Sequence, residues 1–180
     1  MVDLAEIQAA YYMVAATGVL VAAIYYIFNI RQSIQNRKAQ LFTQLTSITI
    51  QKEFLKESNE IMNLRWTDFD DFARKYDSGI DRDNYAKRVQ VWTVMENVGY
   101  YLKKGQIDVE QANTVMQGFY AIWMWGKYAD VIKRYRLILK VPNYYENFEY
   151  LVSELIKFQK KKGYEVIYPG FGGDYNPDSV

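Results

Sequence analysis

The residues with the clearest capacity for chemistry are acidic side chains gathered in one short part of this 180-residue chain. They are Asp68, Asp70, Asp71 and Asp77, continued by Asp81 and Asp83. Carboxylate oxygens are the ligands that Mg²⁺ and Ca²⁺ prefer, so this segment has the donor atoms for a divalent cation. A calcium loop of the EF-hand type needs acids at alternate positions, a glycine at the sixth and a glutamate at the twelfth, which this spacing lacks. Helix capping and turn formation explain most of these acids, so we expect no metal site and no catalytic site here.

The composition excludes much of enzyme chemistry. Histidine and cysteine are absent, which removes imidazole bases, thiolate nucleophiles, zinc fingers, disulfides and triads of the Ser-His-Asp kind. Gly170, Gly172 and Gly173 lie near the C-terminus rather than between a strand and a helix, so they predict no phosphate loop. The 22 Lys and Arg nearly cancel the 21 Asp and Glu, so no basic field attracts nucleic acid. We predict no enzyme activity, no cofactor, no small-molecule substrate and no nucleic-acid partner.

The chain contains an uncharged apolar run over residues 9–30. A helix of this length spans about 33 Å, which matches the roughly 30 Å hydrocarbon layer of a bilayer. A cleaved signal peptide begins with basic residues, whereas Asp3 and Glu6 precede this run. A core helix of a soluble protein seldom lacks a charged face over such a length. Aromatic residues of the kind that favour the headgroup layer lie near both ends: Tyr11, Tyr12, Tyr25, Tyr26 and Phe28. The run predicts one transmembrane helix.

Basic residues follow this run but do not precede it. Arg31, Arg37 and Lys38 would lie at the lipid interface and hold that flank in the cytoplasm. The sequence thus predicts a single-pass protein of the cell membrane, with residues 1–8 outside and the C-terminal part in the cytoplasm.

Small residues lie on one side of the predicted span. Ala15, Gly18 and Ala22 could let another helix approach closely, and Gly18 with Ala22 forms a small-xxx-small pair. Alanine-rich spans carry such pairs by chance, so an intramembrane partner is the minority interpretation.

The remaining residues predict an all-α domain over 31–163, built as a bundle of about four to five helices. Ile34, Leu41, Ile48, Leu55 and Met62 recur every seven residues, and 31–65 contains no Pro or Gly, so one long amphipathic helix is expected there. A coiled coil would need a second column of apolar residues beside this one, and the corresponding positions here are mostly polar. Self-association through this segment is therefore the weaker alternative.

Further helices are predicted from caps and apolar periodicity. Thr67 would cap a short helix over 68–76, and a helix apolar on two sides follows over 82–104. Asp108 and Gln111 resemble a capping box that opens a helix over 109–139. Asn143 with Glu146 would cap a last helix ending near 163, followed by an irregular tail over 164–180.

Two basic clusters could meet anionic lipid, although ordinary solvated faces would look the same. They are Lys133, Arg134, Arg136 and Lys140, and Lys157, Lys160, Lys161 and Lys162. The four tryptophans are expected in the core or in groove walls. Trp123 and Trp125 cannot both face one core, so one of them should lie in a groove or interface.

Several separated motifs resemble one family. They are QAAYYMVAATGVLVAAIYYIFNIRQS, MNLRWTDFDDFARKYDSGIDRDNYAKR, GQID and YYENFEYL. Together they are similar to an uncharacterised group of small archaeal membrane-anchored proteins that carry a helical domain of unknown function. The resemblance covers the chain to about residue 162. It implies one N-terminal anchor and a cytoplasmic helical domain, and no activity, substrate or catalytic residue can be carried over from it. Six residues match its motifs and are interpreted as structural: Trp66, Asp68, Phe69, Phe72, Asn147 and Phe148.

These observations favour a membrane-anchored helical domain that binds another protein or further copies of itself, as a scaffold, sensor or accessory subunit. Two alternatives stay open. The first is a membrane-surface enzyme with a carboxylate-bound divalent cation, and the second is a binder of anionic lipid surfaces.

Overall fold

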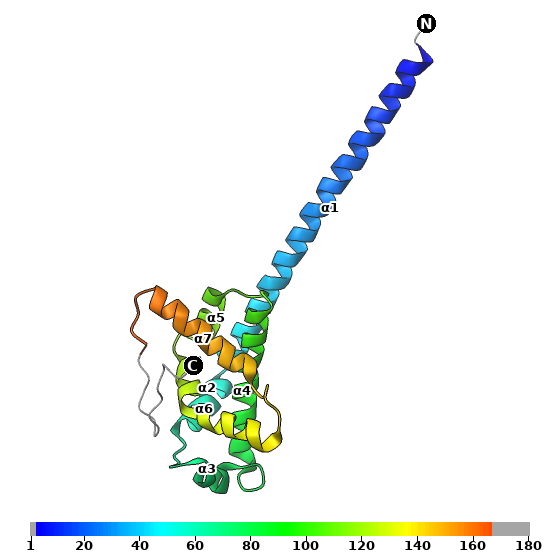
Figure 1. Ribbon diagram of the computed structural model, residues 1–180. Coiled ribbons are helices and arrows are strands. Elements are labelled where there is room, and N and C mark those ends of the chain that lie inside the picture. Colours follow the sequence, from blue (N-terminus) through cyan, green and yellow to red (C-terminus); the bar gives the residue numbers. More distant parts are fainter. Residues whose placement is uncertain (1–2, 167–180) are drawn as a thin grey trace. The chain divides into compact units, whose positions relative to one another are not determined.

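A computed structural model describes residues 3–166 of the chain. Every regular element in that part is a helix, as the sequence predicted (Figure 1). The helices are α1 (Leu4–Thr49), α2 (Lys52–Asn63), α3 (Phe69–Tyr76), α4 (Arg82–Lys103), α5 (Val109–Val115), α6 (Tyr120–Leu139) and α7 (Glu146–Lys161). The predicted irregular tail lies, from residue 167 onward, outside the described residues.

The chain divides into two compact units between Leu41 and Phe42. The first contains most of α1, whose residues 4–40 all have exposed side chains. Its apolar run is long and apolar enough to cross a membrane, and none of its most apolar window is buried inside the protein. The run contains no helix-breaking proline, and Gly18 is tolerated inside the helix. The predicted helix over 9–30 is therefore present as part of a longer one.

The second unit has its core around α4. Val91, Trp92, Met95 and Val98 on this helix are almost completely buried. α4 packs most extensively against α7 and also contacts α2, α3 and α5. The helix predicted over 82–104 to be apolar on two sides is thus the central one, because only a helix with neighbours on several sides can bury both stripes.

A glycine permits the close approach of α4 and α7. A Cβ atom added to Gly99 would lie 1.9 Å from the Asn147 carbonyl oxygen and 3.2 Å from the Leu151 Cβ. No side chain fits at the first distance, so α7 crosses directly over the backbone of α4 at this point.

The prediction of one long helix over 31–65 is wrong. α1 ends at Thr49 and α2 begins at Lys52, with Gln51 in an extended conformation. The break turns the apolar face of α2 to the core, where Phe54 and Ile61 are buried. No Pro or Gly marks the position, so the burial of α2 rather than a local signal ends α1.

The helix predicted over 109–139 is also two helices. Gln117 and Gly118 have φ values of 50° and 71°, and two successive residues in the left-handed region cannot continue a right-handed helix. Gly118 therefore separates α5 from α6, whereas Gly126 stays inside α6. With both breaks, the described residues after α1 form six helices, α2 to α7, where about four to five were expected.

The predicted caps have mixed outcomes. The Asp108 and Gln111 capping box is confirmed, with both of its reciprocal hydrogen bonds present. Asp68 rather than Thr67 caps α3, because its carboxylate accepts a hydrogen bond of 2.8 Å from the Asp71 amide. The Asn143 side chain does not cap the last helix, since α7 begins after Tyr145, which has a left-handed conformation.

Candidate functional site

Three charged side chains that are buried or half-buried in the second unit lie against the ends of helices other than their own. A helix C-terminus leaves carbonyl groups without partners and carries partial negative charge, while an N-terminus leaves amides and partial positive charge. Three of these ends receive a side chain of the complementary sign from α4 or α6. We call Lys127, Arg88 and Glu96 the capping charges, and with the aromatic rings around them they form the most elaborate polar arrangement in the described residues.

Lys127 and Tyr128 on α6 donate hydrogen bonds to carbonyl groups at the C-terminus of α2. The Lys127 Nζ donates a hydrogen bond of 2.7 Å to the Leu64 carbonyl, and the Tyr128 hydroxyl donates one of 2.6 Å to the Ile61 carbonyl. Lys127 also lies 4.4 Å from the centre of the Trp66 ring. These contacts connect α2 with α6, and the carbonyls and the ring face offset part of the cost of burying the cation.

Arg88 on α4 contacts the C-terminus of α3. Its Nη1 donates a hydrogen bond of 3.1 Å to the Tyr76 carbonyl. The guanidinium lies 4.6 Å from the centre of the Phe72 ring and 5.3 Å from that of Trp92. Its Nε and Nη2 atoms are buried without hydrogen-bond partners, so the ring faces are its main compensation for lost water.

Aromatic rings join these two contacts into one cluster. Trp66 lies 5.1 Å from both Phe72 and Tyr128, and Trp92 lies 5.1 Å from Tyr128, measured between ring centres. Phe69 is half-buried and contacts Tyr135 at 5.3 Å. The motif residues Trp66, Phe69 and Phe72 are thus brought together against α4 and α6, and all of them pack.

Glu96 on α4 accepts hydrogen bonds at the N-terminus of α7. Its carboxylate accepts hydrogen bonds of 2.8 Å from the Phe148 amide and 2.7 Å from the Asn147 side chain. Phe148 itself is fully buried against Trp125, with ring centres 5.0 Å apart. This long-range cap replaces the local one expected from Asn143.

We expect Glu96→Ala to lower the free energy of unfolding by about 1 to 2 kcal/mol, as for loss of an N-cap that leaves an amide unsatisfied. Glu96→Gln should cost less, because the amide oxygen can still accept one of the two hydrogen bonds. Urea unfolding of the full chain in mild detergent measures both values. Equal losses for the two variants would show that the carboxylate is not acting as an acceptor for α7.

Burial, and to a smaller extent the nearby charge of Arg65, lowers the pKa of Lys127 from 10.5 to about 8. At a pH between the folded and the unfolded pKa of Lys127, the unfolded chain binds more protons than the folded one. The free energy of unfolding should therefore rise as the pH is raised from 7.5 to 9.5. We expect Lys127→Met to flatten this rise. Urea midpoints at the two pH values, for wild type and variant, measure the difference. A rise that persists unchanged in the variant would assign it to another group.

Most aspartates of the acidic segment have partners within the fold. Asp68 caps α3, and Asp71 accepts a hydrogen bond of 2.7 Å from Lys75 that lowers the pKa of its carboxyl. Asp77 accepts hydrogen bonds from the Ser78 amide and the Tyr135 hydroxyl, while Asp70 is exposed. Within residues 3–166, no three His, Cys, Asp or Glu side chains are arranged to hold a metal ion. The structure does not gather these residues into one site.

The candidate residues on α1 all have exposed side chains. Ala15, Gly18 and Ala22 are exposed in the first unit, as are Arg31, Arg37 and Lys38. Trp123 and Trp125 do not both face the core, as expected: Trp125 is fully buried, and Trp123 is half-buried beside Phe119, with ring centres 4.3 Å apart.

A small pocket of about 80 Å³ lies between α2 and the turn from α5 to α6. Phe54, Leu55 and Met116 supply apolar walls, and the buried hydroxyls of Ser58 and Tyr120 lack hydrogen-bond partners. Burial raises the pKa of Tyr120 to about 12, so this phenol stays neutral at physiological pH. The pocket can hold water or a small apolar molecule, and it offers no acid or base near neutrality.

Sequence reasoning missed all three capping charges, although a signal for them exists. Arg88 lies on the apolar stripe of Tyr85, Trp92 and Met95, at spacings of three, four and seven residues. A charged residue in such a stripe must enter the core with its neighbours, and it then needs a buried partner.

The fold and these contacts define a helical domain that follows a long apolar helix and uses its buried charges to hold its own helices together. The chain belongs to the family described as Domain of unknown function (DUF4760), whose profile matches residues 12–155. This confirms the resemblance to an uncharacterised family. The match includes most of the apolar run, so that run is part of the family's domain. Comparisons with curated proteins and with solved structures gave no significant match.

Proposed function

We propose that this protein is a single-pass membrane protein whose cytoplasmic helical domain binds another protein, as a scaffold, sensor or accessory subunit. The observation that carries the proposal is the apolar run of α1, whose side chains are exposed over its whole length. A helix with this surface is stable only when an apolar phase surrounds it, and a bilayer has the matching thickness. Arg31, Arg37 and Lys38 after the run favour a cytoplasmic location for the domain.

Two features argue against the other interpretations of α1. The family match extends into the apolar run, and α1 continues without interruption to Thr49, which is unlike a segment removed by signal peptidase. A buried core helix would have its apolar side chains covered, whereas those of residues 9–30 are exposed.

A binding role rather than catalysis is supported by how the polar groups are used. The three capping charges are engaged at helix ends, and the acids of the 68–77 segment form caps and surface contacts. A catalytic group needs a perturbed side chain that faces a substrate-sized cleft. Lys127 has the perturbed pKa, but its Nζ is directed at the Leu64 carbonyl.

Crosslinking in native membranes tests this role. The chain has no natural cysteine, so a single Lys104→Cys variant can carry a photoreactive group on the exposed surface of the second unit. We expect one discrete product that contains a second kind of protein and that forms in intact membranes. Recovery of only self-crosslinked chains would instead indicate a homo-oligomer and would overturn the accessory-subunit role.

A further inference from the structure

The surface at the end of α6 combines exposed aliphatic side chains with basic residues. We call residues 131–145 the α6–α7 corner. Four of its aliphatic residues stay exposed at the end of α6: Leu137 by 70%, Ile138 by 54%, Leu139 by 51% and Val141 by 39%. Exposed aliphatic side chains grouped at one helix end favour an interaction site.

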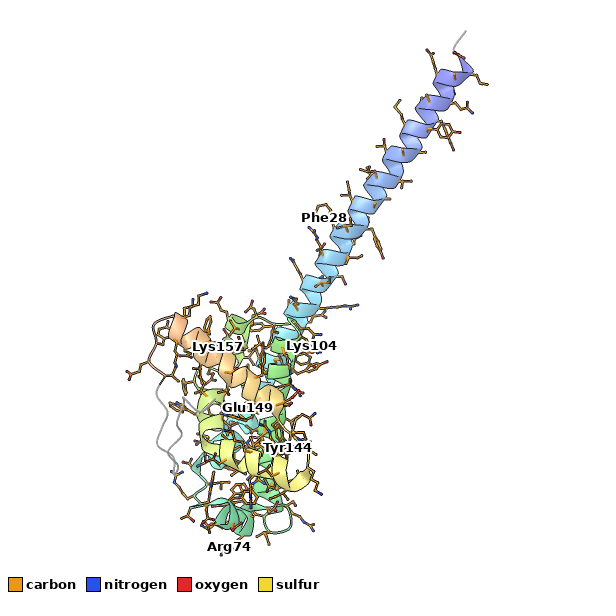
Figure 2. The ribbon with its side chains drawn as sticks, viewed as in Figure 1. Phe28, Arg74, Lys104, Tyr144, Glu149 and Lys157 are labelled. Atoms are coloured by element: carbon orange, nitrogen blue, oxygen red, sulfur yellow. The ribbon has the colours of Figure 1, made fainter. Side chains whose placement is uncertain are left out.

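The segment 131–145 carries only basic charges, while Asp77 from the turn after α3 contacts its Tyr135 hydroxyl. It contains Lys133, Arg134, Arg136 and Lys140 and no acidic residue. Arg136 is engaged inside the fold, because it donates 2.6 Å to the Glu149 carboxylate and 2.9 Å to the Tyr144 carbonyl. The other three have no ion pair among the described residues. Figure 2 shows Tyr144 and Glu149 on the segments that meet at this corner.

The geometry points to an anionic lipid surface as the partner of the α6–α7 corner. Aliphatic side chains enter the boundary between headgroups and acyl chains, while adjacent Lys and Arg neutralise lipid phosphates and carboxylates. α6 ends here because Lys140 has a left-handed conformation and Pro142 follows, so the aliphatic residues lie at the end of the helix. The inference rests on the proposed function in one respect, because the membrane anchor would keep the corner close to a bilayer.

A second copy of the chain fits this corner less well. In a two-fold symmetric contact the same patch meets itself, so Lys133, Arg134 and Lys140 of each copy would face like charges. Four aliphatic side chains also provide much less than the roughly 800 Å² per partner that a stable interface buries. Neither objection applies to a lipid surface.

An environment-sensitive fluorophore can test this contact directly. Because the chain has no cysteine, an Ile138→Cys variant of the full chain can carry a single NBD group, with Lys104→Cys as the exposed control. Vesicles of phosphatidylcholine, with or without phosphatidylserine, are added to the chain in phosphatidylcholine nanodiscs, or in buffer if α1 does not retain it in the discs. Retention in discs reports on the proposed anchor, and the NBD spectrum reports on the corner.

We expect a blue shift at position 138 with vesicles that contain phosphatidylserine, none with phosphatidylcholine alone, and none at position 104. Each basic residue near such a surface contributes roughly fivefold to binding, so Arg134→Glu with Lys140→Glu should weaken it by at least about twentyfold. Both residues are exposed, so this variant should stay folded. An unshifted spectrum with anionic vesicles, an equal shift at position 104, or a shift that follows protein concentration without vesicles would overturn the inference, the last in favour of a second copy.

Discussion

Gly99→Ala is expected to lower the free energy of unfolding by about 3 kcal/mol, at the upper end of the range for overpacked cores. The added Cβ would lie 1.9 Å from the Asn147 carbonyl oxygen, which is backbone and cannot rotate away. α7 would have to move off α4, and this is the most extensive helix contact in the second unit. The movement would also separate Glu96 from the amide of Phe148, so one methyl group disturbs both the packing and the cap of α7.

Gly79→Ala is the matched control for this change. An added Cβ at Gly79 meets nothing within 4 Å, and no positive φ disfavours a side chain there. Its effect should stay within about 0.5 kcal/mol, as for ordinary surface substitutions. Urea unfolding of the full chain in detergent, followed by tryptophan fluorescence, compares the two variants. Equal midpoints would contradict the close approach of α4 and α7.

Arg88→Ala is expected to cost about 3 to 4 kcal/mol, as for the loss of a large buried side chain. The change leaves a cavity beside Phe72 and Trp92 and removes the hydrogen bond to the Tyr76 carbonyl. Arg88→Met should cost only about 1 kcal/mol. Methionine fills most of the volume, and it removes the two buried nitrogens that have no partners, which offsets the lost hydrogen bond.

The difference between the two Arg88 variants separates packing from charge. The same unfolding measurement gives it, with far-UV circular dichroism as a check that α3 remains helical. If methionine is as harmful as alanine, then the guanidinium contributes mainly through its charge and hydrogen bond, and the aromatic rings do not compensate for its burial.

The sequence predicted the elements that have local signals. α3 and α4 were expected within one or two residues of their ends, because caps and apolar periodicity are properties of neighbouring residues. The break between α1 and α2 has no such signal. Gln51 is a good helix former, and the chain leaves the helical conformation there because Phe54 and Ile61 are buried against other helices. Periodicity over 31–65 could not reveal this competition between local propensity and burial.

The capping charges could not be paired from sequence for a related reason. Lys127 and the Leu64 carbonyl are 63 positions apart, and Glu96 and Phe148 are 52 apart. The Asn143 cap was expected because its spacing to Glu146 fits a local cap, yet Glu96 from another helix takes that role. A charge in an apolar stripe indicates that a buried partner exists, and only the fold identifies the partner.

The central proposal is that a bilayer surrounds the apolar run of α1. Alkaline extraction of cell membranes, followed by ultracentrifugation, measures this for the full chain. A Leu20→Arg/Ile24→Arg variant is the comparison, because each arginine near the centre of a span costs about 2.5 to 3.5 kcal/mol of insertion free energy. We expect the natural chain in the membrane pellet until detergent is added, and a large part of the variant in the supernatant. A natural chain that stays in the supernatant without detergent would contradict the membrane anchor, the cytoplasmic topology and the tethered binding role.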